Sequence, residues 1–319
     1  MRFPKLSEQP TSRSITDVFA GYNHTIRIGY GEFYDEENMC SDNYPLLSTR
    51  RARGVYASPA APQGLIAKDA LCYVDGTKFV INGRAVEMNL STAAAKCPKS
   101  LTSMGAYVII MPDKKYINTV ETSDRGSIEA SYQSMAGVRF RLCTAEGTDV
   151  EATASAAAPE KPSNGAYWLD TSGAKHALKV YSSAADIWTT VATTYVKISA
   201  TGIGVQFKQY DGVTIAGITK KTVKDLNGSA VIWSKADDYI VVVGLLDAAV
   251  EQTAEEGTIT VKRTMPDMDF VVESGNRLWG CKYGYVNGKT INEIYASKLG
   301  DFKNWSCYMG ISTDSYTAS

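Results

Sequence analysis

The chain has 319 residues, of which 21% are charged, and a formal net charge of −1 at pH 7. This balance excludes a protein that binds polyanions through bulk positive charge, and it excludes a disordered acidic chain. The 19 tyrosines, 26 glycines and 2 histidines favour β-structure and leave few general bases for catalysis.

The sequence also bears on membrane insertion, secretion, and thiol and metal chemistry. No apolar run approaches the roughly 18 residues that cross a bilayer, and residues 1–8 lack the apolar stretch of a signal peptide. We therefore expect no membrane segment and no secretion by a signal peptide. The six cysteines are scattered without a Cys-x-x-Cys pair, so we expect reduced, mostly buried thiols; disulfides or metal binding are the alternative. Since His24 and His176 are far apart, we expect no metal site and no cofactor.

The first 20 residues are polar with scattered apolar anchors. They predict an N-terminal arm, which either is tied down late or completes a sheet in this chain or in a neighbour. Polar turns and short strands follow, up to a basic cluster of Arg50, Arg51 and Arg53. We expect this cluster to be a solvated loop or an ion-pair site at a subunit interface; the alternative is contact with DNA phosphates.

Residues 64–118 show the clearest strand pattern. Asp75-Gly76 and Asn82-Gly83 predict tight turns between short strands, and a second unit begins at Met104 with a turn at Pro112-Asp113. The strands of the first unit are expected at 65–67, 70–74, 78–81 and 85–88. The 36 residues from Leu71 to Tyr107 approach the roughly 40-residue repeat of propeller blades. Residues 21–143 therefore predict the first β-propeller-like blades.

The composition changes after residue 143. Residues 144–164 are rich in Ala, Thr and Glu and predict a linker. Residues 165–264 carry at least six short strands without helical periodicity, which predicts an inserted β-sandwich-like or barrel-like domain. Trp168, Trp188 and Trp233 are expected to anchor its core; an aromatic glycan platform is the alternative.

Residues 265–319 predict a resumed propeller-like blade, after which the chain ends before the architecture is complete. Strands at 277–281 and 291–297 flank an Asn287-Gly288 hairpin turn. We expect either a truncated or short form, or an arc of blades that other subunits complete, because an open arc leaves sheet edges unpaired.

Two segments resemble a known family. They are NRLWGC (276–281) with NEIYASKLGDFKNW (292–305), and GEFYDEENMCSDNYPLLSTRRARG (31–54). Both resemble the propeller-containing stabilisation or tail-hub proteins of tailed bacteriophages and prophages, of which this chain would be an N-terminal portion. Residues 162–188 also resemble small β-modules of phage tail and fibre proteins.

The resemblance implies an all-β fold, a partial or interrupted β-propeller with an inserted β-sandwich-like domain. It implies a structural component of the neck, tail hub or tail. Such a protein is assembled in the bacterial cytoplasm, resides in the virion, forms homo-oligomers and contacts portal, neck or tail subunits. In the blade motif we expect Trp279 and Trp305 to fill the core and Arg277 to pair with an acidic neighbour. Gly300 would permit a turn, and Asp301 or Asn304 would hydrogen-bond across it.

Catalysis is not expected. Residues 284–290 mimic a P-loop but have three residues between the glycines where the motif has four, and no helix follows. The acidic pairs Asp237-Asp238 and Asp267/Asp269 lie at an apparent turn and a domain junction. The alternative function is receptor or glycan binding by the inserted domain, and a polysaccharide-degrading tail enzyme is the third hypothesis.

Overall fold

The computed structural model describes residues 15–40, 43, 48–220, 225–286 and 288–319. Strands make up 44% of the chain and helices 2%, which confirms the all-β class. The helical segments of the described residues are two 3₁₀ turns, η1 (Ala94–Lys96) and η2 (Ala254–Glu256). No helix in these residues is long and apolar enough to cross a bilayer. The chain divides into two compact units, Met1–Ser58 and Pro59–Ser319.

The first unit has two pairs of two-residue strands. Gly21–Tyr22 (β1) is parallel to Glu32–Phe33 (β2), and Met39–Cys40 (β3) is antiparallel to Ser48–Thr49 (β4). Phe19 is buried, with its ring centroid 4.9 Å from that of Phe33. Most of the predicted N-terminal arm lies outside the described residues.

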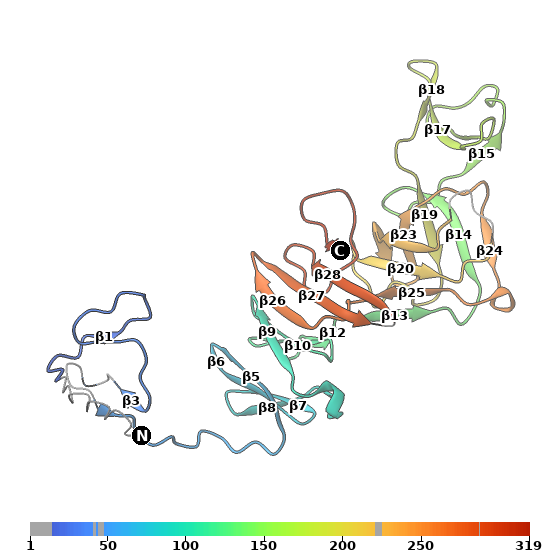
Figure 1. The fold of residues 1–319 in the computed structure, drawn as a ribbon. Coiled ribbons are helices and arrows are strands. Elements are labelled where there is room, and N and C mark those ends of the chain that lie inside the picture. Colours follow the sequence, from blue (N-terminus) through green and yellow to red (C-terminus); the bar gives the residue numbers. More distant parts are fainter. Residues whose placement is uncertain (1–14, 41–42, 44–47, 221–224, 287) are drawn as a thin grey trace, which may run out of the picture. The chain divides into compact units, whose positions relative to one another are not determined.

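Three four-stranded antiparallel sheets in the second unit share one topology, in which each strand pairs with the next along the chain. We call them the first, second and third sheets (Figure 1). The first contains β5 (Pro62–Lys68), β6 (Ala70–Asp75), β7 (Lys78–Ile81) and β8 (Arg84–Glu87). The second contains β9 (Ser100–Met104), β10 (Tyr107–Met111), β11 (Lys115–Asn118) and β12 (Arg125–Ser127). The third contains β26 (Phe270–Ser274), β27 (Arg277–Val286), β28 (Lys289–Ala296) and β29 (Tyr316–Ala318).

Turn residues explain why the first sheet follows its predicted strands closely. Gly76, Asn82 and Gly83 have φ angles of 61°, 46° and 78°, in the left-handed region that Gly and Asn tolerate and tight hairpins require. In the third sheet, β27 and β28 are longer than the strands expected at 277–281 and 291–297. The predicted turn between them includes Asn287, which lies outside the described residues.

The three sheets are held together by two apolar cores. Val108 and Ile110 of β10 lie in the core with the first sheet, against Val74 and Phe79. Ile109, the residue between them, lies in the other core, with the third sheet. Successive side chains of a strand point to opposite faces, so the second sheet is covered on both sides.

The first strands of the three sheets lie next to one another, since β9 contacts both β5 and β26. The backbone N–H of Lys99 donates to the Gln63 carbonyl at 2.5 Å, and the Thr102 hydroxyl donates to the Val271 carbonyl at 3.0 Å. Gly64 permits this approach, because a Cβ there would lie 2.8 Å from the Lys99 carbonyl oxygen. The sheets therefore fan out from a shared line of first strands.

Two further sheets pack face to face around one large core, and we call them the two-sheet body. One contains β13 (Ala130–Gln133), β25 (Thr260–Arg263), β20 (Gly212–Ala216) and β21 (Gly228–Val231). The other contains β22 (Ser234–Ala236), β23 (Tyr239–Val243), β19 (Tyr195–Ser199), β14 (Val138–Cys143) and β24 (Val250–Gln252). Both supply fully buried side chains to the core, including Phe140, Ile198, Val213 and Val261.

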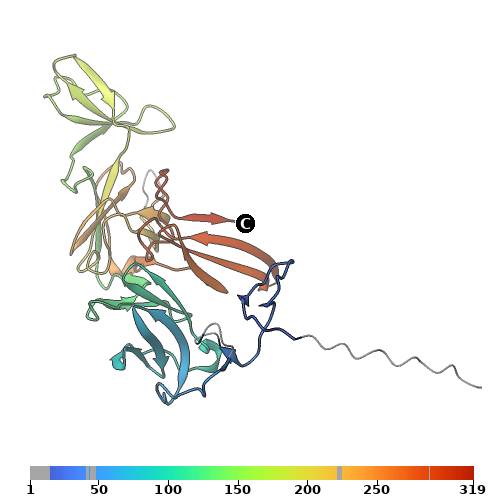
Figure 2. The ribbon, with the colours of Figure 1, turned by 90° about the vertical axis from the view of Figure 1, so that its left-hand side faces the viewer.

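A small sheet leaves this body between β14 and β19. It contains β15 (Ala152–Ser155), β16 (Tyr167–Asp170), β17 (Ala177–Ser182) and β18 (Ile187–Thr190), with β15 parallel to β16. Leu169 and Leu178 join the core of the two-sheet body. In both ribbon views the small sheet projects from one end of the two-sheet body, at the top of the picture (Figures 1 and 2).

The observed domain boundaries differ from the predicted ones in two places. The segment expected as a linker, 144–164, contains β15. The two-sheet body begins at β13, before residue 165, because β13 pairs with β25 and β14 pairs with β19. Both pairings join distant segments, which a local strand pattern does not show.

Candidate functional site

The C-terminal motif lies where the third sheet meets its neighbours. Trp305 is 2% exposed and packs with Phe302 in the core shared with the second sheet. Its indole N–H donates to the Phe302 carbonyl at 2.9 Å. Burying so large a ring supplies much of the apolar contact at this junction.

Asn304 ties the same motif to the two-sheet body. Its side-chain oxygen accepts the Gly212 backbone N–H at 3.0 Å, and its Nδ2 donates to the Tyr210 carbonyl at 2.7 Å. Gly212 is required here, because a Cβ would lie 2.1 Å from the Ser306 carbonyl oxygen. Asn304 is fully buried, so the asparagine acts as a bridge between segments about ninety residues apart.

The other motif residues shape the loop around this bridge. Gly300 has a φ of 73°, and the Asp301 carboxylate accepts the Lys303 backbone N–H at 3.0 Å. Arg277 donates to three backbone carbonyls, those of Ser297, Ser312 and Asp314, at 2.6–2.7 Å. The structure thus gives Arg277 carbonyl partners in place of the expected acidic one.

Trp279 differs from Trp305, because it is half-buried on the opposite face of the third sheet. Its indole N–H donates to the Ser274 carbonyl at 3.1 Å, and its ring centroid is 6.2 Å from that of Tyr316. Leu278, the preceding residue, is fully buried toward the second sheet. Trp279 therefore marks a second face, which we call the open face.

The open face is rich in apolar and aromatic side chains. Strand register places Val272 and Ala296 opposite Trp279, and Phe270 and Ile294 opposite Cys281. Six of its large side chains are 48–78% exposed: Phe270, Val272, Tyr283, Tyr285, Ile294 and Tyr316. Exposed apolar patches of this kind mark interaction sites on soluble proteins.

A hollow of about 390 Å³ lies at one end of the open face. Trp279 and Tyr316 line it from the sheet, and Ile311 and Ser312 line it from the loop before β29. Arg277 also lines it, but its guanidinium is already bonded to three carbonyls of its own chain. Asp314 and Ser315 also line the hollow, which therefore combines two aromatic rings with several polar groups.

The small sheet brings together two of the three predicted glycan-platform residues. Trp168 and Trp188 lie with ring centroids 5.4 Å apart, and the Lys179 ammonium lies 4.7 Å from the Trp168 centroid. Register places them on the face opposite Leu169 and Leu178. A hydrogen bond from Lys179 to Asp170, at 2.8 Å, lowers the pKa of that carboxyl.

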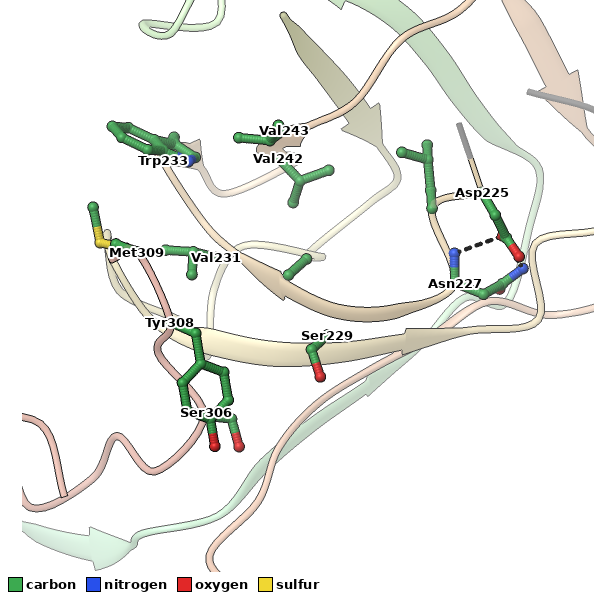
Figure 3. Close-up of a pocket in the computed structure, with 12 residues that line it drawn as sticks. Asp225, Asn227, Ser229, Val231, Trp233, Val242, Val243, Ser306, Tyr308 and Met309 are labelled. Atoms are coloured by element: carbon green, nitrogen blue, oxygen red, sulfur yellow. Dashed lines mark hydrogen bonds between the residues drawn. The ribbon is translucent and has the colours of Figure 1, made fainter. Parts of the chain in front are cut away.

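Trp233 lies elsewhere, in a pocket of about 320 Å³ on the two-sheet body (Figure 3). Tyr308, Met309 and Ser229 share the lining, and Asp225 accepts hydrogen bonds from Asn227. Trp233 also contacts Tyr195 and Tyr210 edge to face. An indole and a phenol beside short polar groups can accommodate a sugar ring.

The remaining predicted residues lie outside these surfaces. Arg50 bonds Asn38 through its guanidinium at 3.3 Å, while Arg51 and Arg53 are exposed.

The acidic pairs have structural partners. Asp269 accepts from Lys282 at 2.6 Å, Asp267 pairs with Lys114 at 2.7 Å, and Asp238 accepts the Gly202 N–H at 2.7 Å. In the described part of the chain, no group of three or more His, Cys, Asp or Glu is arranged to hold a metal ion. Burial raises the pKa of the Cys143 thiol to about 12, which keeps it protonated and unreactive.

No model of a protein family matches the chain, and no curated protein sequence matches it either.

Proposed function

We propose that this chain is a structural component of a tailed-phage or prophage particle, in its neck, tail hub or tail. It works through contacts between subunits and performs no chemistry. The observation that carries the proposal is the open face of the third sheet, a broad apolar surface on a sheet whose other face is packed. A surface of this composition is stable in water when a partner covers it.

The arrangement of the three sheets supports a partial propeller as the framework. Four-stranded meanders fan out from adjacent first strands, as blades do around a propeller axis. The two-sheet body interrupts this series between β12 and β26, as a guest domain would. The NRLWGC and GDFKNW segments, through which the chain resembles phage stabilisation and tail-hub proteins, lie in the third sheet and in the loop between β28 and β29.

Particle composition tests the proposed function. Particles of a phage or induced prophage that encodes the chain would be purified by density gradient and analysed by quantitative mass spectrometry. We expect the chain at a fixed copy number per particle, and an amber mutation in its gene should yield incomplete particles. Normal infectious particles that lack the chain would contradict the proposal.

The pocket around Trp233 favours glycan binding as a second function. Saturation-transfer NMR with host surface oligosaccharides would detect binding by the full chain. We expect Trp233→Ala to abolish the transfer and Trp188→Ala, on the small sheet, to preserve it. Equal transfer from wild type and Trp233→Ala would exclude this pocket, and loss only in Trp188→Ala would move the site to the small sheet.

A further inference from the structure

We propose that the open face of the third sheet docks onto the first sheet of a second copy of this chain, in a head-to-tail contact. The inference builds on the proposed structural function and names the partner and the surface. The two faces concerned are the outermost faces of the three-sheet row.

The chain itself shows twice how such sheets pack. The first and second sheets share one core, and the second and third share another. In each case a sheet presents one face to its predecessor and the opposite face to its successor, as β10 does with Val108 and Ile109. We call the face that a sheet presents to the preceding sheet its predecessor-type face, and the face that it presents to the following sheet its successor-type face. The open face is the successor-type face of the third sheet. By this pattern, it would pack against the predecessor-type face of another such sheet.

The first sheet carries a face of that type. Register places Leu65 opposite Tyr73, and Tyr73 opposite Val80, on the side away from Val74 and Phe79. Leu65 is 68% exposed. Tyr73 is half-buried and Val80 is 5% exposed. Lys78 lies at one end of the same face, opposite Asp75 and Glu87, so the apolar part of this predecessor-type face is centred on Leu65 and Tyr73. A second copy therefore offers the kind of surface that the third sheet requires.

Charge also favours an apolar partner. Among the described strand residues of the open face, Arg277 is the one charged side chain, and its guanidinium donors bind carbonyls of the same chain. By contrast, the inward face of the sheet carries the charged side chains of Lys282 and Glu293, which strand register places opposite each other. An acidic peptide or a nucleic acid would find no free charge on the open face, whereas the apolar side chains around Leu65 and Tyr73 would cover it.

A contact between two different faces has a geometric consequence. Because each copy uses one face to bind and presents the other, the assembly either closes into a ring or continues as a filament. Blocking either face alone should stop growth, and two differently blocked copies should still join once.

Two variants, each blocked on one of the two faces, test this head-to-tail contact. Val272→Asp places a carboxylate on the open face and Leu65→Asp places one on the first sheet; Val120→Asp, at a turn residue 83% exposed, is the matched control. Sedimentation and light scattering of the full chain would be measured up to about 100 µM, a concentration at which a contact with a micromolar Kd is saturated. We expect wild type and Val120→Asp to associate, and each blocked variant to bind itself at least about 100-fold more weakly. An equimolar mixture of the two blocked variants should form heterodimers.

Three results would overturn the proposal. They are a monomeric wild type at the highest concentration, self-association that survives Val272→Asp, and a mixture of blocked variants that stays monomeric. Circular dichroism and melting curves of each variant would show that its fold is intact. The proposed function fails separately, because it is decided by the presence of the chain in purified particles. A monomer found in particles would overturn only the head-to-tail contact.

Discussion

The second and third sheets have the same strand order, but the second sheet is covered on both faces and the third sheet on only one. In β10, Val108, Ile109 and Ile110 are all fully buried, although successive residues face different cores. In β27, Leu278 is fully buried and Trp279 is half-buried, while Tyr283 and Tyr285 are exposed. A sheet with two apolar faces needs two neighbours, and the described chain supplies both only to the second sheet.

Substitution on the covered face of the third sheet tests this comparison most strongly. Trp305→Ala should lower the free energy of unfolding by about 3–5 kcal/mol, because it opens a cavity in the core shared with the second sheet. Urea denaturation monitored by circular dichroism would measure the loss. A change below about 1 kcal/mol would mean that Trp305 does not hold these sheets together.

The junction with the two-sheet body should show the next largest effect. Asn304→Leu keeps a similar volume but leaves the Gly212 N–H and the Tyr210 carbonyl without their buried partner. We expect a loss of about 1–3 kcal/mol. Hydrogen exchange at the Gly212 amide gives a local readout, since it should accelerate while amides of the first sheet keep their protection. Unchanged exchange at Gly212 would show that Asn304 does not bridge these segments.

The open face should tolerate substitution in the isolated chain. Trp279→Ala should cost about 1 kcal/mol or less, because the ring is partly in water and has no opposing core. The same variant should weaken self-association, which Trp305→Ala does not alter directly. Comparing melting and sedimentation for this matched tryptophan pair separates folding from docking. A loss of stability as large as that of Trp305→Ala would show that the open face is a packed face.

We expect the smallest change in stability on the small sheet. Its outward face carries an ion pair, whereas both faces of the second sheet are covered by neighbouring sheets. The Lys179 ammonium lowers the pKa of Asp170 below its ordinary value of 3.8. A depressed carboxyl pKa contributes stability above the ordinary pKa, and this contribution is lost as the pH falls through and below that value. We expect acid to lower the urea-unfolding midpoint of wild type more than that of Asp170→Asn. Fluorescence between pH 6 and about 2 would measure this, and identical curves would refute it.

Local features of the fold could be predicted from the sequence, because they depend on neighbouring residues. Asp75-Gly76 and Asn82-Gly83 give the turns of the first sheet, since their backbone conformation favours those residues. The pairing of β14 with β19 could not be predicted, because about fifty residues separate the two strands and their alternation resembles that of any half-buried strand.

The candidate surfaces were only partly accessible to sequence reasoning. Trp279 and Trp305 look equivalent as aromatic anchors, and only the register of β26, β27 and β28 places Trp279 on the open face. The carbonyl partners of Arg277 come from the loop before β29, which has no sequence signal for that role. Alternating apolar residues at 270, 272, 279 and 281 were the available signal for the open face.

The position of the small sheet has a consequence for how the protein can vary. The chain leaves the two-sheet body at the end of β14 and returns at the start of β19, and these strands are neighbours in one sheet. Entry and exit therefore lie side by side, as at sites where proteins tolerate exchanged modules. Replacing residues 152–190 would alter the displayed surface and leave strand pairing in the body unchanged, provided that the new module supplies apolar side chains in place of Leu169 and Leu178. Under the proposed particle role, exchange of this module would change the surface presented to a host around a constant framework.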